Sequence, residues 1–522
     1  MTSTKRRYLV GRIVASAVVA ALIGFALARA FAGGSPTPPP DDAAALIPRD
    51  ALVYLNLGTD RSSSRWRRAA DAMSKLQVVA QLRDALVAGA TGGALGHLRL
   101  DRDVSPWLGD EGAYALLPGR PQRTLLVLKA HKPGLARRSI DGAAGSTLPE
   151  TYRGVLLRGI GKGSVAGVAG GWAIVGGRDA VHAALDLRLR PAGSLAEDKA
   201  YHELTDGLPR DRLANGWLSG AWIGAHLAGP TRALAGLARA PGIRAAAVSF
   251  GDDGKRMRIA FRAQPVPGPG AGPGCTGERG QSGDLLSRAP AHPALFVGLA
   301  GAECLLRDLM ASPGSAAGKA LQSFSAQAQK VGVNVGRELL PLLGGDNALS
   351  VTPGRGAPTI TLDAGGVPPQ AGMNVLGRLQ PALIDMVRPE DRGAEPGFSA
   401  QTVRGVTPLT AELTPALHLS YAALGGDLVV STAMSGVVGA ERGQHLDENK
   451  DFKLVLGDRP DSPSALVFLD LKKLLALADQ AGLGSNPTYG AVRDDLGKIG
   501  AAGAVLAREG NDIDAELRLK NP

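Results

Sequence analysis

The sequence predicts an α+β protein of two tandem homologous lobes, each with a largely antiparallel sheet and packing helices, preceded by one transmembrane helix. Three observations lead to this prediction: an internal repeat, clusters of short strand patterns, and an apolar segment near the N-terminus. Strands that arrive in clusters separated by short turns, with helices bracketing them, favour an antiparallel α+β fold over an alternating parallel one.

The apolar segment at residues 8–32 contains only two charged side chains, Arg12 and Arg29. A helix of this length spans ~37 Å, enough to cross a hydrocarbon layer of about 30 Å. The basic residues before it predict a cytoplasmic N-terminus and an extracytoplasmic bulk in a single-pass cell-membrane protein. The alternative is a cleaved signal peptide with the small-residue site Ala28-Arg29-Ala30 or Ala30-Phe31-Ala32. In both interpretations the lobes are exported. If residues 8–32 are a signal anchor, the lipid bilayer is their partner.

Two segments rich in Gly and Pro divide the remainder of the chain. The first contains Pro38-Pro39-Pro40, which favours an extended, semi-rigid spacer. The second begins at Pro265 and falls where the repeat places a lobe boundary. The predicted organisation is a cytoplasmic N-terminus (1–7), a signal-anchor helix (8–32), a spacer (33–45), a first lobe (46–264), a linker (265–288) and a second lobe (289–522).

The internal repeat consists of four blocks in the same order in both halves. Its span exceeds the period of about 20–50 residues that is typical of solenoids, so it predicts duplication of a whole domain. The matched blocks are Pro48 with Leu52–Leu57 and Pro293 with Leu295–Leu299; Pro106-Trp107-Leu108-Gly109 and Pro341-Leu342-Leu343-Gly344; Leu195–Tyr201 and Leu446–Phe452; and Ile243–Arg262 and Ile499–Arg518.

Within the first lobe, alternating or continuous apolar runs bounded by turn residues predict most of the elements. A helix is expected after Ser62, with its Trp66 and Met73 stripe packed in the core, and another over 179–187. Asp252-Asp253-Gly254 predicts a hairpin turn. The expected strands are 52–57, 113–117, 124–130, 155–160, 165–169, 172–175, 213–218, 245–250 and 258–262.

Composition limits the partners that this protein can have. The chain is 44% hydrophobic but only 4% aromatic, so the cores must be built mainly of Ala, Val and Leu. The formal net charge is +10, and five of the positive charges lie in residues 1–33, which contain no acidic residue. No basic stripe with interleaved aromatic residues occurs in the remainder, so nucleic acid is not an expected partner.

The sequence contains no recognisable catalytic, cofactor-binding or metal-binding motif. No two of the eight histidines lie four residues apart, as a helical zinc site would require, and no Gly-x-Ser-x-Gly motif occurs. Gly159-Ile160-Gly161-Lys162-Gly163-Ser164 lacks the spacing of a phosphate-binding loop and favours a turn between two strands. We therefore expect no catalytic residue, no cofactor and no metal.

The two cysteines, Cys275 and Cys304, form a candidate disulfide. Export makes a disulfide permissible. Closing a loop of about thirty residues would contribute ~3–4 kcal/mol to stability in the chain-entropy model. The alternative is a free thiol in the linker and a buried Cys304.

Three segments resemble a known family: Pro48 leading into an apolar strand, Asp103-Val104-Ser105-Pro106-Trp107-Leu108-Gly109, and Asp198-Lys199-Ala200-Tyr201. Together they resemble the bacterial family named domain of unknown function 3352. The resemblance covers nearly everything after the spacer. It implies an N-terminally anchored, extracytoplasmic protein, and it implies no activity, cofactor or catalytic residue.

Three functional hypotheses remain open. The first is a non-enzymatic, uncharacterised cell-envelope protein with a binding or scaffold role, whose partner is an envelope protein. The second is a carrier or chaperone for an apolar ligand held in a cleft between the lobes. The third is an unrecognised envelope hydrolase, whose catalytic residues should cluster around one concave pocket. The oligomeric state is not predicted.

Overall fold

The computed structural model places most of the two predicted lobes. The predicted signal-anchor helix (8–32), the helix expected after Ser62 and most of the linker lie outside the described residues. Within the described residues, no helix combines the length and apolar composition that a membrane crossing requires. The structure describes residues 40–59, 100–119, 123–145, 148–161, 163–226, 242–266, 286–287, 289–310, 316–354, 357–387, 397–414, 417–439 and 445–521.

The first half of the chain contributes ten of the described strands and several short helices. Its strands are β1 (Val53–Gly58), β2 (Leu108–Leu117), β3 (Arg123–Ala130), β4 (Glu150–Tyr152), β5 (Val155–Gly161), β6 (Ser164–Ala169), β7 (Trp172–Gly177), β8 (Arg212–Ser219), β9 (Ile243–Asp252) and β10 (Arg256–Pro265). Its helices are η1 (Asp42–Leu46), η2 (Leu100–Val104), α4 (Pro133–Ala143), α5 (Arg178–Leu189), η3 (Leu195–Glu197), α6 (Lys199–Asp206) and α7 (Gly220–His226).

The second half contributes the other ten described strands. They are β11 (Leu295–Ala300), β12 (Asp346–Thr352), β13 (Thr359–Ala364), β14 (Ser399–Ala400), β15 (Leu409–Thr414), β16 (Leu417–Leu424), β17 (Asp427–Ser431), β18 (Ala465–Asp470), β19 (Ala501–Glu509) and β20 (Asp512–Lys520). Its helices are α10 (Ala302–Met310), α11 (Ala316–Lys330), η4 (Val335–Leu339), η5 (Leu340–Leu343), α12 (Pro369–Val387), α13 (Met434–Val438), η7 (Leu446–Glu448), α14 (Lys450–Leu456), α15 (Leu471–Gln480), η8 (Leu483–Ser485) and α16 (Pro487–Ile499).

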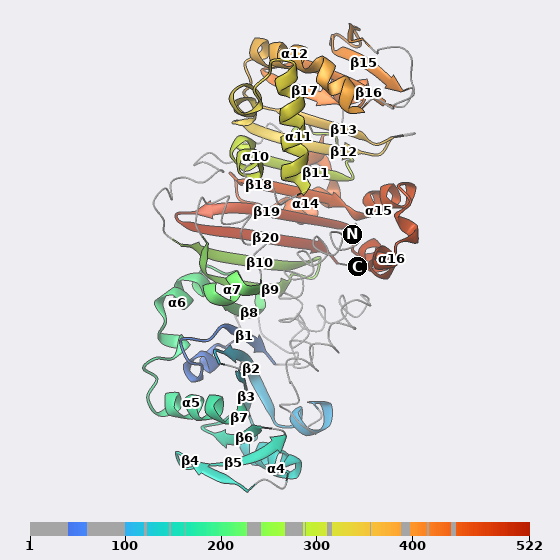
Figure 1. Cartoon of the computed structure of the whole chain (residues 1–522). Helices are drawn as coiled ribbons and strands as arrows, with labels where there is room; N and C mark the ends of the chain where they lie inside the picture. Colours follow the sequence, from blue (N-terminus) through green and yellow to red (C-terminus); the bar gives the residue numbers. More distant parts are fainter. Residues whose placement is uncertain are drawn as a thin grey trace.

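All of these strands pair in one continuous antiparallel succession along the length of the molecule (Figure 1). The strand order is the same in both halves when it is read outward from the central pair β10 and β20. In the first half the order is β10-β9-β8-β1-β2-β3-β7-β6-β5-β4. In the second half it is β20-β19-β18-β11-β12-β13-β17-β16-β15-β14.

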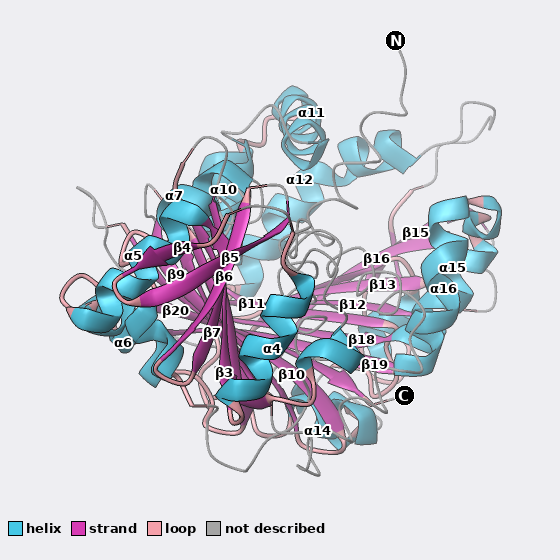
Figure 2. Cartoon of the chain, turned by 90° about the horizontal axis from the view of Figure 1, so that it is seen from below, coloured by secondary structure: helices cyan, strands magenta, loops and turns pink. Residues whose placement is uncertain are grey.

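The α+β class with a largely antiparallel sheet is confirmed, and the strands predicted for the first half are present. The sequence suggested a separate sheet in each lobe, whereas the structure joins the halves through the ladder between β10 and β20. An outermost strand has unpaired backbone groups, and each half supplies one such strand that pairs with the other. Figure 2 shows how the strands fan out across the joined sheet, as expected from accumulated twist.

Helices cover both faces of the sheet, which explains why its central strands are apolar on both sides. In β1, Tyr54 belongs to one core and the adjacent Leu55 to the core on the opposite face. Helix α5 contributes to the core that contains Tyr54, and α4 contributes to the core that contains Leu55. In the second half, α12 packs against Tyr421 on one face, and α13 packs against Ala422 on the other.

The repeated block around residues 195–201 and 446–452 forms the same local structure in both halves. In each copy a short 3-10 helix precedes an α-helix whose N-cap side chain accepts a backbone hydrogen bond. Asp198 Oδ1 accepts from the N–H of Tyr201 at 3.0 Å, and Asn449 Oδ1 accepts from the N–H of Phe452 at 3.0 Å. The sequence similarity of the block therefore reflects a conserved turn and helix start.

The repeated Pro-x-Leu-Gly block also has a structural explanation. Trp107 is buried, and its indole N–H donates to the carbonyl oxygen of Asp103 at 2.6 Å. A Cβ atom at Gly109 would lie 3.0 Å from the carbonyl oxygen of Lys129, so the close approach of β3 favours glycine.

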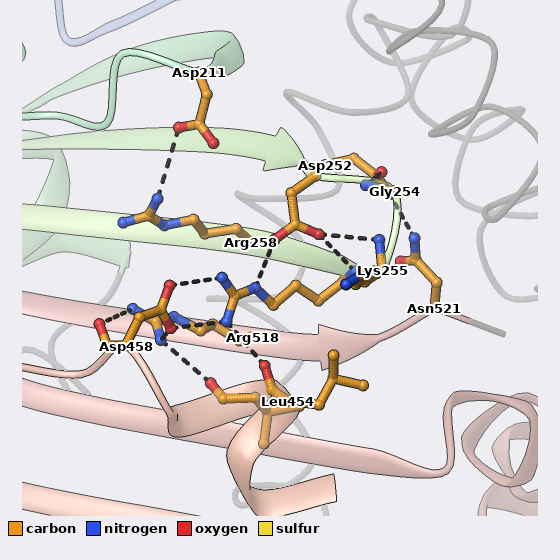
Figure 3. Close-up of polar contacts among 12 residues, drawn as sticks. Asp211, Asp252, Gly254, Lys255, Arg258, Leu454, Asp458, Arg518 and Asn521 are labelled. Carbon is orange, nitrogen blue, oxygen red and sulfur yellow. Dashed lines mark hydrogen bonds and ion pairs between the residues drawn. The ribbon is translucent and has the colours of Figure 1, made fainter. Parts of the chain in front are cut away.

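Charged side chains reinforce the join between the halves (Figure 3). Arg258 on β10 lies directly opposite Arg518 on β20 in the strand register, and Glu516 forms ion pairs with both. Arg518 is 2% exposed and also pairs with Asp458. Arg256 of the first half reaches across to Asp458 at 2.6 Å. The seam is therefore a hydrogen-bonded ladder with a charge network over it.

Candidate functional site

A pocket of about 400 Å³ opens on one face of the second half, over strands β12 and β13. Small-molecule sites usually have volumes of about 300–1,000 Å³, so this pocket is large enough for a small ligand. Its described lining residues are Ala289, Pro290, Phe296, Ala348, Ser350, Thr352, Pro353, Gly354, Thr359, Thr361, Asp363, Ser435, Gly436 and Gly439.

The floor of the pocket is the inner end of a row of hydroxyl side chains that crosses the sheet. Residues paired across antiparallel strands point to the same face. Successive pairs link Phe296 to Ser350, Ser350 to Thr361, Thr361 to Ser431, Ser431 to Ser420, and Ser420 to Thr410. We name Ser350, Thr361, Ser431, Ser420 and Thr410 the hydroxyl row. Only Ser350 and Thr361 of this row line the pocket.

Hydrogen bonds link the pocket hydroxyl of Thr361 to the rest of the row. Ser431 Oγ donates to the carbonyl oxygen of Ile360 at 3.1 Å and accepts from the N–H of Ala433 at 3.3 Å. Thr361 Oγ1 lies 3.0 Å from Ser431 Oγ, and either hydroxyl can be the donor in this contact. Thr361 is therefore held against Ser431 at the floor of the pocket.

Ser350 supplies a hydroxyl of a different kind. It is 5% exposed and lines the pocket, and its side chain makes no hydrogen bond within the described part of the chain. The Ser350 oxygen is not one of the fully buried polar atoms that lack a partner, so it is accessible from the pocket. Ser350 is therefore a donor and acceptor that a bound molecule could satisfy.

The short helix α13 forms one wall of the pocket and lies directly on the hydroxyl row. Its Val437 and Val438 pack against Val429 on the sheet. A Cβ atom at Gly436 would overlap the hydroxyl oxygens of Ser431 and Thr361, so only glycine allows this close approach.

The same face of the first half is apolar at the matched positions. The row that corresponds to Phe296, Ser350, Thr361, Ser431 and Ser420 consists of Tyr54, Ala115, Leu125, Gly176 and Val165. Asp363 pairs with Val429 on β17, and Val127 pairs with Ile174 on β7 at the matching place. In the first half this face is filled by η1 and by the twelve-residue helix α5, whereas α13 has five residues.

The chemistry of the pocket is that of neutral hydrogen bonding. Asp363 is the one ionisable side chain among its described lining residues, which include no lysine, arginine or histidine. None of these described residues is a base of the kind that activates a serine nucleophile. Phe296, Ala348 and Pro290 give the pocket an apolar side next to its hydroxyl floor.

A second cavity lies between α15 and α16 and is more open to solvent. Its lining includes Lys472, Arg493 and Asp479. Arg493 forms an ion pair with Asp479 at 2.7 Å, and Tyr489 donates to the same carboxylate. The carboxylate of Asp479 therefore already has Arg493 and Tyr489 as hydrogen-bond partners within the chain.

A buried polar cluster fixes the start of the described chain to the first half. The carboxylate of Asp41 accepts a 2.6 Å hydrogen bond from the hydroxyl of Tyr54 and another from Tyr201. Burial raises the pKa of Asp41, and hydrogen bonds from the two tyrosines oppose that shift. Burial and the charge of Asp41 together raise the pKa of both tyrosines. The tyrosines thus remain protonated donors at neutral pH.

Glu111 lies in the same cluster and has no exposed surface. Its Oε1 accepts from the backbone N–H of Ala43 at 2.7 Å. Burial raises the pKa of Glu111 to about 8, and the charges of Asp41 and Asp42 act in the same direction. None of these residues lines either cavity described above, so the cluster serves to position η1.

The structure describes only one cysteine of the candidate disulfide. Cys304 lies in α10 and is disulfide-bonded, whereas Cys275 lies outside the described residues. The pairing of these two cysteines therefore stays a prediction. Among the described residues, no group of three or more His, Cys, Asp or Glu side chains could hold a metal ion.

The sequence interpretation missed the hydroxyl row. The signal was available in the repeat, because the block that contains Pro106 and the block that contains Pro341 can be aligned through the following strand. That alignment places Ser350 opposite Ala115. Matching apolar runs identified the repeat, but the informative positions are those where the copies differ.

Comparisons with solved structures found chains that resemble part of this one. Crystal form I of TP0453 has a TM-score of 0.27 and 8% sequence identity, and the match covers 44% of this chain and 81% of that chain. Crystal form III of TP0453 has a TM-score of 0.26 and 10% identity, with coverage of 44% and 82%. No function is drawn from similarities this weak. No curated protein matches the chain.

A family model provides the assignment. The model described as "Protein of unknown function (DUF3352)" matches residues 13–371, which is well over half of the chain. The match includes the three segments on which the resemblance was based, and it continues into the second half as far as the start of α12. The chain therefore belongs to the DUF3352 family, whose function is unknown.

Proposed function

We propose that this chain is an exported, membrane-anchored binding protein without a catalytic role. In this proposal the first half is a scaffold and the second half holds a small ligand. The observation that carries the proposal is the difference between the halves at matched sheet positions. Leu125 and Val127 lie in a filled core, whereas Thr361 and Asp363 line a pocket.

We further propose that the two halves are tandem copies of one ancestral unit. The identical strand order and the repeated turn before α6 and α14 support this origin. Duplication explains how a buried sheet face could become a polar pocket. One copy retained its apolar core, and the other could accept Ser350 and Thr361 without loss of the whole fold.

The lining of the pocket favours binding over the hydrolase alternative. Ser350 and Ser435 are the described lining residues that could act as serine nucleophiles, and no histidine or lysine is among the described lining residues. The carrier alternative placed an apolar ligand in a cleft between lobes. Among the described residues the halves meet at the β10–β20 ladder, and the pocket of the second half offers an apolar cargo a place to bind.

The cellular location in this proposal rests on the sequence. Residues 8–32 supply the anchor, and the positive charges before them orient it. The described chain starts at Pro40, the last of the three spacer prolines, and its carbonyl oxygen accepts a 2.6 Å hydrogen bond from Asn56 Nδ2. The spacer would thus join the first half at a fixed point.

The experiment that tests binding compares the full chain with a variant whose pocket is filled. Ser350→Leu/Thr361→Leu places two larger side chains in the pocket, and Ser399→Leu at the exposed edge strand β14 is the control. Each protein is purified from its native membrane and studied by native mass spectrometry. We expect wild type and Ser399→Leu to carry a bound small molecule that the filled variant lacks.

A wild-type mass that equals the bare chain in every preparation would contradict the proposal. The same bound mass on the filled variant would also contradict it, because the ligand would then lie elsewhere. Circular dichroism of all three proteins shows whether the filled variant has kept its fold.

A further inference from the structure

We infer that residues 40–47 form a strap that the first half holds at acidic pH and loosens at mildly alkaline pH, which lengthens the tether between the lobes and the membrane. The strap comprises Pro40, Asp41, η1 and Ile47. The loosening of the strap is independent of the proposed ligand pocket. The lengthening of the tether rests on the proposed membrane anchor.

The first half holds the start of the strap through polar side chains on its sheet and on α6. Tyr54 donates to the carboxylate of Asp41 at 2.6 Å, and Tyr201 donates to the other oxygen of the same carboxylate. Asn56 Nδ2 donates to the carbonyl oxygen of Pro40 at 2.6 Å. The first residues of the strap are therefore fixed by hydrogen bonds from strand β1 and helix α6.

Glu111 on β2 holds the middle of the strap. Its Oε1 accepts from the backbone N–H of Ala43 at 2.7 Å. Its Oε2 is buried without a hydrogen-bond partner among the described residues. A buried carboxylate with one hydrogen bond is unfavourable when it is ionised, because it has lost most of its hydration. The closed strap therefore favours the protonated form of Glu111.

The second half has apolar side chains at the matched positions of this cluster. Strand pairing places Phe296 at the position of Tyr54, and the repeated turn places Phe452 at the position of Tyr201. Phe452 packs edge-on against Phe468 with 5.6 Å between ring centroids. The fold thus accepts an apolar core at this place, and apolar packing is often at least as stabilising as a buried charged group. The polar cluster is specific to the segment that joins the first half to the spacer.

Ionisation of Glu111 opposes the closed strap. Burial raises the pKa of Glu111 from 4.5 to about 8, and the charges of Asp41 and Asp42 act in the same direction. An opened strap exposes the carboxyl group to water, where its pKa returns to the ordinary value. Between these two values the open state has lost a proton that the closed state keeps, so the open-to-closed ratio rises by up to about tenfold per pH unit. Above about pH 8 the ratio levels off.

Other charged groups face the strap from the elements packed against it. Lys129 on β3 forms ion pairs with Asp42 at 3.1 Å and with Asp110 of β2 at 3.3 Å. The charge of Arg212 on β8 acts on Asp41, and the ring of His202 on α6 lies against Tyr201. Helix α5 meets η1 with apolar side chains. Because histidine side chains titrate between about pH 5 and 8, the test must separate Glu111 from His202.

Release of the strap changes the reach of the tether. An extended chain spans about 3.5 Å per residue, so residues 40–47 would add up to ~28 Å to the spacer. The chain beyond the strap stays fixed through the bridge between Pro48 and Ser194 and through the hydrogen bond from the N–H of Arg49 to Gly193. The first half can therefore keep its sheet while the strap opens.

Hydrogen–deuterium exchange of the full chain in detergent measures the opening. Exchange is followed in peptides from the strap and, as the reference, from β10 and β20, between about pH 5 and pH 8.5. The rates are corrected for the intrinsic dependence of amide exchange on pH. We expect protection of the strap to fall by at least about tenfold across this range relative to the reference strands.

Three variants assign the effect to its residues. Glu111→Gln removes the ionisable group and keeps an oxygen for the N–H of Ala43, so strap protection should no longer change with pH. Glu197→Gln changes an exposed carboxyl group on η3, which packs against η1, and should behave as wild type. Tyr201→Phe introduces the side chain of the second half and should lower strap protection by about ten- to a hundredfold at every pH.

The remaining outcomes overturn the inference. Strap protection in wild type that does not change with pH would show that the strap is not pH-dependent. A pH dependence that persists in Glu111→Gln would assign it to another group, such as His202. Equal protection in wild type and Tyr201→Phe would show that the carboxylate of Asp41 does not hold the strap. None of these results bears on ligand binding, which native mass spectrometry decides separately.

Discussion

At the scale of single residues, Glu111 shows how the fold changes the chemistry of a carboxyl group. It lies beneath η1 with no exposed surface, and burial raises its pKa from 4.5 to about 8. Between these two values the unfolded chain has released a proton that the folded chain keeps. The contribution of Glu111 to stability is therefore greatest below pH 4.5 and is lost as pH rises towards 8.

Glu111→Gln removes this penalty while keeping a carbonyl oxygen for the N–H of Ala43. We expect little difference from wild type at pH 4.5 and a higher unfolding midpoint for the variant at pH 8. The upper limit of the difference in unfolding free energy is about 5 kcal/mol, since the pKa rises from 4.5 to about 8 and each pKa unit corresponds to about 1.4 kcal/mol. Thermal unfolding followed across this pH range measures it, with the exposed Glu448→Gln as control. A constant difference at all pH values would contradict the assignment.

At the scale of secondary-structure elements, the position of α13 depends on one glycine. Gly436 allows the helix to touch Ser431 and Thr361, whereas Gly439 at its end has open space around its Cβ position. Alanine is favoured over glycine in a helix by up to about 1 kcal/mol. The two positions should therefore respond in opposite directions.

We expect Gly436→Ala to lower the free energy of unfolding by about 1–3 kcal/mol, because overpacking displaces α13 from the hydroxyl row. Gly439→Ala should be neutral or slightly stabilising. Chemical denaturation of both variants measures the difference. Equal effects at the two glycines would show that α13 does not rest on the hydroxyl row.

At the seam between β10 and β20, the carboxylate of Glu516 pairs with both of two facing positive charges, which also have Asp211 and Asp458 as separate partners. Arg258 and Arg518 lie directly opposite each other, and like charges at such positions are destabilising. Glu516 forms ion pairs with both and is only 14% exposed at its side chain.

Glu516→Gln should therefore destabilise the protein by about 3 kcal/mol, the range for removing one partner of a buried ion pair. Glu303→Gln removes a surface partner of Arg307 within α10 and should cost less than about 1 kcal/mol. The difference between the two denaturation midpoints is the measurement. A loss for Glu516→Gln no greater than that for Glu303→Gln would mean that the charge network does not stabilise the join.

At the scale of the whole molecule, the orientation across the membrane is open to a direct test. With residues 8–32 as anchor, a C-terminal tag should be removed by protease added outside intact spheroplasts, and an N-terminal tag should be protected. The intact mass of the membrane-bound protein then distinguishes an uncleaved anchor from cleavage near Ala30 or Ala32. A C-terminal tag that is protected until the cells are lysed would rule out export.

The predicted disulfide belongs to the same scale because it closes the segment that joins the two halves. Peptide mapping without reductant should yield a cross-linked peptide that contains Cys275 and Cys304. Reduction, or Cys304→Ser, should lower stability by ~3 kcal/mol. Recovery of Cys275 as a free thiol from protein purified without reductant would exclude this pairing.

Sequence patterns determined most of the local structure of this protein. The apolar run in β1, the turn at Asp252-Asp253-Gly254 and the N-caps Asp198 and Asn449 depend on residues close in the chain, so their structures follow from spacing and side-chain type. The repeat aligned the two halves for the same reason.

Only the tertiary structure decided where the halves meet and where the pocket lies. The β10–β20 ladder pairs residues about 250 positions apart, such as Arg262 with Asp514, and local pattern does not specify such a partner. The pocket likewise requires Ser350, Thr361 and Ser431 to lie side by side on three strands. Strand pairing sets those neighbours, and the short helix above them leaves the space open, so neither could be read from adjacent residues.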